Sequence, residues 1–119
     1  MKAEKESISK KKLLEEADFS KLNGLIPVIT QDQNTKEILM LGFMNKEALE
    51  KTLQERRVTY FSRTRNSLWT KGETSGNVQC IKEMNLDCDN DSLLIKVEQK
   101  GNVCHTGKPT CFFKEVSKK

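Results

Sequence analysis

Two apolar, β-branched runs separated by a short polar turn constrain the fold of this 119-residue chain more than any other feature. The runs span residues 25–30 and 37–43, and the segment between them, 32–35, is rich in residues that favour turns. Side chains of this type fit the half-buried surface of a sheet. The pattern therefore predicts an antiparallel hairpin in the first half of the chain.

Further strands are expected after this hairpin. Residues 58–62 are rich in strand-forming side chains, and residues 68–70 favour another short strand. Residues 78–87 and 93–98 alternate well enough to predict a second hairpin, whose turn is an acidic cluster.

Asn45 predicts the start of one principal helix, because its side chain can accept hydrogen bonds from backbone N–H groups of the first turn. We expect the helix over about residues 46–56. The sequence thus predicts a mainly β fold of the α+β class, with one principal helix and antiparallel sheets. The buried face of the helix is expected to carry Ala48, Leu49, Thr52 and Leu53.

The length fits one domain. We divide the chain into a charged N-terminal extension at 1–20, a single domain at 21–114 and a basic C-terminal tail at 115–119. The extension alternates Lys and Glu, which is more typical of a mobile or weakly helical segment than of a core element. Because only 35% of the residues are hydrophobic, we expect a dimer or a bound metal to add stability.

Charge and hydropathy exclude some functions. No apolar run approaches the roughly 20 residues of a membrane span, and the N-terminus lacks the hydrophobic core of a signal peptide, so we expect a cytoplasmic protein. There, the four cysteines should be thiols or metal ligands rather than disulfides. The net charge of +4 is concentrated at the ends, which argues against a dedicated nucleic-acid binder. A local basic cluster at 56–71 is either a solvated face or a site for substrate phosphates.

An acidic cluster surrounds one cysteine: Asp87, Asp89 and Asp91 flank Cys88. Carboxylate oxygens suit magnesium, calcium or manganese, whereas thiolates select zinc, so the segment predicts sites for two metals. In a strand the acids and the cysteine would face opposite sides, and in a tight turn the carboxylates would still converge. A solvated acidic turn is the alternative. An EF-hand loop is disfavoured, because Ser92 stands where that motif requires glycine.

The other cysteines lie further along. Cys104 and Cys111 are seven residues apart, wider than the spacing of structural zinc knuckles. Cys88 must therefore join them through the fold or from a second subunit. Three cysteines would leave one zinc position open for water, as in catalytic sites. Cys80, on a predicted strand, is interpreted as a small buried apolar residue.

His105 is the only histidine of the chain and directly follows Cys104. Imidazole titrates near neutral pH, so His105 is the candidate general acid or base.

Three ordered motifs across residues 25–113 resemble the phosphoribosyl-AMP cyclohydrolase family of histidine biosynthesis. They are Trp69-x-Lys71-Gly72-Glu73-Thr74-Ser75-Gly76, Asp87-Cys88-Asp89-x-Asp91, and Cys104-His105-Thr106-Gly107 followed by Cys111-Phe112.

The resemblance implies hydrolytic opening of the adenine ring of 1-(5-phosphoribosyl)-AMP between N1 and C6, with Zn²⁺ and Mg²⁺ as cofactors, in an intertwined homodimer. This chain departs from the family pattern at Asn77, where many similar sequences carry histidine. By motif position, Cys88, Cys104 and Cys111 would bind zinc, with Cys88 supplied across the dimer interface, and Asp87, Asp89 and Asp91 would bind magnesium.

The expected mechanism uses zinc to activate water for attack on C6 of the purine, and His105 to move a proton to or from the reacting atoms. Trp69 is either a purine-stacking residue or a core residue. The candidate substrate-binding residues are Arg63, Arg65, Trp69, Lys71, Glu73, Thr74, Ser75 and Gly76.

A non-catalytic, zinc-stabilised module that binds RNA or another anionic partner is the alternative function. Strongly salt-dependent nucleic-acid binding and a closed four-ligand zinc site would favour it.

Overall fold

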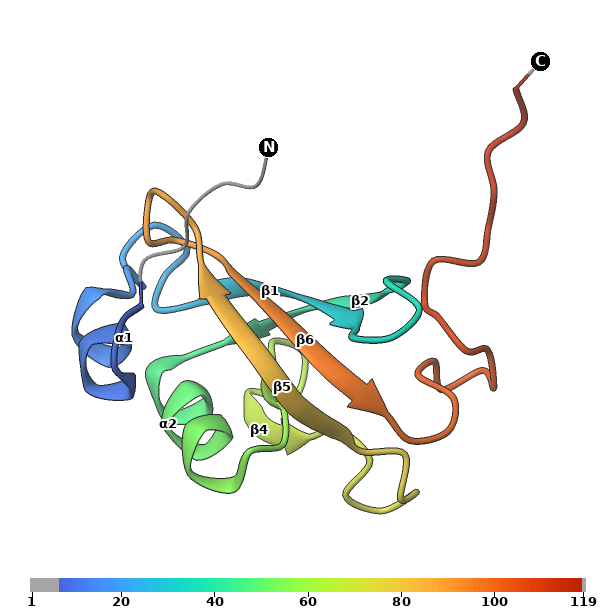
Figure 1. Cartoon of the computed structure of the whole chain (residues 1–119), viewed down its shortest axis with the longest axis horizontal. Coiled ribbons are helices and arrows are strands. Elements are labelled where there is room, and N and C mark those ends of the chain that lie inside the picture. Colours follow the sequence, from blue (N-terminus) through green and yellow to red (C-terminus); the bar gives the residue numbers. More distant parts are fainter. Residues whose placement is uncertain (1–6, 119) are drawn as a thin grey trace.

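The computed structural model describes residues 7–118, which form two helices and six strands (Figure 1). In chain order the elements are α1 (Lys10–Glu16), β1 (Ile26–Asp32), β2 (Ile38–Met44), α2 (Lys46–Glu55), β3 (Thr59–Ser62), β4 (Ser67–Thr70), β5 (Gln79–Leu86) and β6 (Leu93–Gln99).

Four strands form one sheet in the order β2-β1-β6-β5. Both predicted hairpins are confirmed, since β1 pairs with β2 and β5 with β6 in antiparallel fashion. The expectation of antiparallel sheets is confirmed for these pairs and is wrong at the centre, where β1 and β6 are parallel, with Val28 opposite Leu93. The hairpins meet through strands that run in the same direction, and apolar alternation within a strand carries no information about that direction.

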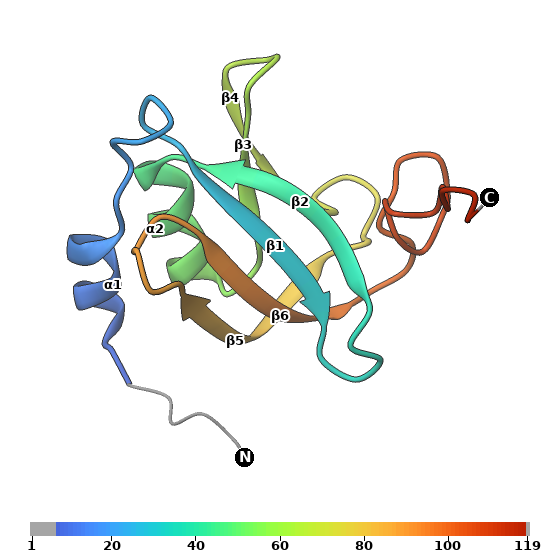
Figure 2. The same ribbon diagram turned by 90° about the horizontal axis from the view of Figure 1, so that it is seen from above.

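The core lies on one face of this sheet. Figures 1 and 2 show α2 on that face, together with the antiparallel β3–β4 pair. Val28 and Ile95 contribute fully buried side chains from the central strands, and Leu49 and Tyr60 meet them from α2 and β3. Gly42 of β2 lies so close to the Tyr60 ring that a Cβ atom there would overlap it. The absence of a side chain at this position lets β3 pack directly on the sheet.

The principal helix is confirmed. The Asn45 side chain accepts a hydrogen bond of 2.8 Å from the backbone N–H of Ala48, as a helix N-cap does. The helix ends at Glu55, and the next residue, Arg56, caps it in a left-handed conformation with φ 59°. The Thr52 hydroxyl accepts a 2.9 Å bond from the N–H of Thr59 and so ties α2 to β3.

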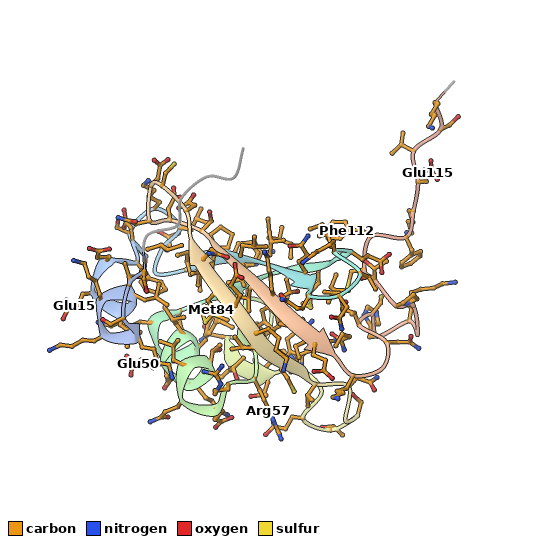
Figure 3. All side chains as sticks on the ribbon, in the orientation of Figure 1. Glu15, Glu50, Arg57, Met84, Phe112 and Glu115 are labelled. Carbon is orange, nitrogen blue, oxygen red and sulfur yellow. The ribbon has the colours of Figure 1, made fainter. Side chains whose placement is uncertain are left out.

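The N-terminal extension is more ordered than its charge pattern predicts. Residues 10–16 form α1, and Leu13 is only 6% exposed within the core cluster. Glu15 of α1 and Glu50 of α2 project outward (Figure 3). The helical form of this expectation is present at residues 10–16, whereas the expectation that the segment is not a core element is wrong, because Leu13 is buried in the core cluster. Residues 1–6 of the predicted extension lie outside the described residues.

Neither helix within residues 7–118 is long and apolar enough to span a membrane. Residues 112–118 form no helix or strand and extend away from the sheet (Figure 1). Phe112 on this segment is 62% exposed (Figure 3).

Candidate functional site

A hollow of about 430 Å³ lies between the loop that follows β4 and the loop that follows β6. These loops come from motifs that are far apart in sequence. The predicted site residues among those lining the hollow are Trp69, Lys71, Glu73, Thr74, Ser75, Cys104 and His105.

Asn77 connects the two loops, although the sequence reasoning did not assign it to the site. Its carbonyl accepts a 3.2 Å hydrogen bond from the Gln99 side chain. Gly72 and Gly101 both have positive φ and lie against Asn77, where an added Cβ would collide with it. Their conformations allow the loops to approach closely. The glycines at positions 72 and 101 were the available sequence signal for a close approach of these loops, but a glycine does not show that Asn77 is the residue it contacts.

Cys104 occupies a tight turn. Its N–H donates to the carbonyl of Lys108 at 3.0 Å, and its own carbonyl accepts from the N–H of Gly107 at 2.9 Å. The Thr106 hydroxyl lies 3.0 Å from the Cys104 sulfur, and this hydrogen bond is the main cause that lowers the pKa of Cys104. The turn therefore favours the thiolate, which is the form that binds metals.

Cys111 lies close enough to Cys104 for each thiol to influence the pKa of the other. The backbone N–H of Cys111 donates to the carbonyl of Leu39 at 2.8 Å, which fixes this position on β2. Burial raises the pKa of Cys111. Two of the three predicted zinc ligands thus lie next to each other, and their soft sulfur donors fit zinc.

His105 is exposed and lines the hollow next to Cys104. The chain therefore places its only imidazole where a substrate in the hollow could contact it.

Trp69 is half-buried. Its ring centroid lies 5.5 Å from that of Tyr60, and it packs against the core while also lining the hollow. Its packing role is confirmed, and purine stacking stays a prediction.

Lys71 is buried, with only 9% of its surface exposed. Its ammonium group donates to the carbonyl of Val103 and lies 5.3 Å from the centroid of the Trp69 ring. Burial lowers the pKa of Lys71, while the neighbouring Cys111 and Cys104 act in the opposite sense.

The two predicted arginines lie elsewhere, in the exposed turn between β3 and β4. The guanidinium of Arg63 is 4.0 Å from the ring centroid of Phe43, and the N–H of Arg65 donates to the Ser62 hydroxyl at 3.3 Å. The described residues that line the hollow include neither arginine, nor Gly76 of the neighbouring loop.

The acidic cluster forms the turn between β5 and β6, as predicted. The Asp87 carboxylate faces its own turn and accepts hydrogen bonds from the N–H of Asp91 at 2.9 Å and the hydroxyl of Ser92 at 2.7 Å. Desolvation raises the pKa of Asp87, but these bonds outweigh it and lower the pKa overall. Asp91 also forms an ion pair of 2.9 Å with Lys21. The turn is therefore held by its own hydrogen bonds and by Lys21, which precedes β1.

Cys88 is exposed in this turn, with its sulfur 3.6 Å from a carboxylate oxygen of Asp89. That negative charge is the main cause that raises the pKa of Cys88. The turn that carries Cys88 precedes β6, and Cys104 follows β6 (Figures 1 and 2). A strand of seven residues is roughly 20 Å long, so Cys88 and Cys104 lie at opposite ends of β6.

Within residues 7–118, no group of three or more His, Cys, Asp or Glu side chains is arranged to hold a metal. One copy of the chain thus presents two sulfur atoms at one end of β6, and the third sulfur with the carboxylates at the other end. Cys80 on β5 is half-buried and belongs to neither group.

Comparison with known proteins identifies relatives along most of the chain. A phosphoribosyl-AMP cyclohydrolase of Clostridium beijerinckii is 53% identical over 88% of this chain and 96% of the relative. One from Desulforapulum autotrophicum is 59% identical over 87% of this chain and 83% of the relative. The histidine biosynthesis bifunctional protein HisIE of Haemophilus influenzae is 59% identical over 84% of this chain, but only 45% of that longer protein is covered.

The family model for phosphoribosyl-AMP cyclohydrolase matches residues 40–113, which include most of β2, all elements from α2 to β6, the hollow and both groups of cysteines. The family match and the extent of identity agree with the three motifs. The chain therefore belongs to the phosphoribosyl-AMP cyclohydrolases, enzymes of histidine biosynthesis.

Proposed function

We propose that the hollow is the active site of a zinc-dependent hydrolase that opens the adenine ring of 1-(5-phosphoribosyl)-AMP between N1 and C6. The observation that carries this proposal is the pair of adjacent sulfurs, Cys104 and Cys111, next to a hollow that His105 lines. A metal held there would lie close to a substrate in the hollow.

Zinc would be held by Cys104 and Cys111 of one copy and by Cys88 of a second copy. The separation of Cys88 from the pair within one copy supports this division. When bound, zinc supplies the Lewis acidity that makes water a nucleophile near neutral pH. We place the activity in the cytoplasm, where reducing conditions keep the thiols available.

His105 would move the proton of the reaction, first as the base that accepts it from the attacking water and then as the acid that delivers it to N1 of the purine. Its exposed position beside Cys104 supports contact with both atoms. Trp69 would stack on the purine with the part of its ring that lines the hollow.

The substrate phosphates would bind the loop that follows β4. The hydroxyl groups of Thr74 and Ser75 are exposed at the hollow, and the backbone of Gly76 is adjacent. Arg63 and Arg65 lie outside the hollow, so we assign phosphate binding to this loop first.

The functional unit would be a homodimer. Ile29 and Leu41 are paired across β1 and β2 on the outer face of the sheet and are 41% and 50% exposed. Leu94 of β6 pairs with Ile29 and is half-buried. Exposed apolar side chains in a contiguous row favour contact with another protein surface. A second copy is the partner that would also complete the sulfur site.

Magnesium would bind the carboxylates of Asp87, Asp89 and Asp91 and share substrate oxygens, as this ion usually does. Lys21 now pairs with Asp91, so the ion would have to displace its ammonium group. Because the family consists of enzymes, we do not retain the alternative of a non-catalytic RNA-binding module.

The test combines a ring-opening assay, followed by ultraviolet absorbance, with analysis of bound metals before and after chelation. We expect turnover to disappear with the chelator and to return when zinc is restored. A metal-replete sample that shows no turnover would contradict the proposal.

A further inference from the structure

We propose that Lys71 is a positioning residue for the zinc ligands, and that it does not bind a substrate phosphate. It would hold the backbone that leads into Cys104 and balance the charge of the sulfur atoms. This inference rests on the proposed zinc site.

Lys71 is fixed at both ends. Its backbone N–H donates to the carbonyl of Val58 at 3.0 Å, which attaches it to the segment that enters β3. Its ammonium group donates to the carbonyl of Val103, the residue directly before Cys104. Val103 is itself 1% exposed in the core. Lys71 therefore links the core to the loop that carries the sulfur of Cys104.

The surroundings of the Lys71 ammonium group indicate which negative charge it balances. A buried charge is costly unless it is paired. The thiols of Cys111 and Cys104 lie close enough to favour the charged form of Lys71 and raise its pKa, and none of the ion pairs found within residues 7–118 joins Lys71 to a carboxylate. The Trp69 ring, 5.3 Å away, adds a cation–π contact.

Charge counting agrees with this arrangement. Three thiolates around one divalent cation carry a net single negative charge. The ammonium group of Lys71 would neutralise that charge in a partly desolvated site, where electrostatic interactions are stronger than in water. Although Lys71 lines the hollow, only 9% of the residue is exposed and its ammonium group already donates to the Val103 carbonyl, which leaves little of it to contact a phosphate.

The first experiment compares the zinc affinity of wild type, Lys71→Met and Lys71→Arg by competition with a chromogenic chelator. Lys108→Met is the matched control, because Lys108 is an exposed lysine of the same loop and bonds Cys104 through its backbone carbonyl, which the substitution keeps. We expect Lys71→Met to weaken zinc binding by about 10- to 100-fold, as for residues that orient metal ligands. Lys71→Arg keeps the charge and should recover part of the loss, and Lys108→Met should bind zinc as wild type does.

The kinetics of the zinc-saturated variants separate the two roles of Lys71. Positioning predicts a fall in kcat with a nearly unchanged KM, whereas phosphate binding predicts a raised KM. Wild-type zinc affinity together with a raised KM in Lys71→Met would overturn the inference. If wild type itself bound no zinc, the proposed function would fail instead.

A second measurement needs no variant. Acetylation of surface amines, read by mass spectrometry, should spare Lys71 in the zinc-loaded enzyme without substrate. Removal of zinc should increase labelling of Lys71, and substrate should give no further protection. Protection that depends on substrate alone would assign Lys71 to the phosphate and overturn the inference.

Discussion

Cys104 and His105 are neighbours in sequence but have different surroundings. The Cys104 sulfur lies beside Thr106 and Cys111, whereas His105 is exposed at the hollow. One side chain is thus placed to hold a metal and the next to meet substrate. Removal of the His105 side chain should therefore leave metal binding by Cys104 intact.

His105→Ala should lower kcat by about 10²- to 10⁴-fold, which is the usual contribution of general acid–base catalysis. Bound zinc should stay at the wild-type level, because the imidazole is not among the proposed ligands. Steady-state kinetics and metal analysis on the same preparation check both statements. Normal turnover in the variant would show that another group moves the proton.

Sequence alone identified the chemistry of these residues but not their contacts. Cys104 and His105 were recognisable from residue type and adjacency, since thiolates and imidazole have few equivalents. Lys71 was interpreted as a phosphate ligand because a basic residue near glycines is ambiguous. Its burial against Val103 depends on a contact between segments 32 residues apart, which no local pattern encodes.

At the scale of the elements, polar turns fix the ends of the strands. The turn between β1 and β2 is organised by Asp32, whose carboxylate accepts from the N–H of Thr35 at 2.8 Å and of Asn34 at 3.0 Å. The bond from Thr35 is the main cause that holds the pKa of Asp32 below its usual value.

Because the folded-state pKa of Asp32 is lowered, its stabilising effect is complete above the unfolded value of about 3.9 and is lost as pH falls through the folded pKa. Asp32→Ala should therefore reduce the free energy of unfolding near neutral pH by on the order of 1 kcal/mol, a hydrogen-bond-sized loss limited by solvent screening. Urea unfolding of both proteins from pH 6 to pH 2 should show the difference shrinking below pH ~4. A constant difference would exclude ionisation of Asp32 as its cause.

The contribution of α1 rests on Leu13. Leu13→Ala should lower the free energy of unfolding by about 2–3 kcal/mol, the lower part of the range for buried leucines, since a peripheral helix can relax. Leu22→Ala is the control, because Leu22 is 46% exposed and should change stability little. Urea unfolding at fixed metal content measures both variants. Equal stabilities would mean that α1 adds little to the core.

The hairpins and α2 were predictable because strand alternation, turn residues and the Asn45 cap are local signals. The parallel pairing of β1 with β6 was not, because it joins segments more than 60 residues apart. Likewise, the three consecutive lysines that follow Ser9 concealed a helix that one buried side chain, Leu13, stabilises.

For the whole molecule, the central pairing of β1 with β6 has a functional consequence. This pairing holds β6 extended between the turn that carries Cys88 and the loop that carries Cys104. The turn and the loop therefore cannot approach each other within one copy unless the sheet is disrupted. The proposed three-sulfur site would therefore combine opposite ends of two copies. The exposed apolar row that includes Ile29 and Leu41 offers a surface for that contact.

Mixing two inactive variants tests this division of the zinc site most directly. Cys88→Ser and Cys104→Ser should each lack activity alone, while subunit exchange in an equal mixture should place one intact site in each heterodimer. Random pairing of symmetric dimers then predicts recovery of about a quarter of the wild-type activity and zinc content. Native mass spectrometry confirms the exchange, and heterodimers that stay inactive and zinc-free would contradict a site shared between two copies.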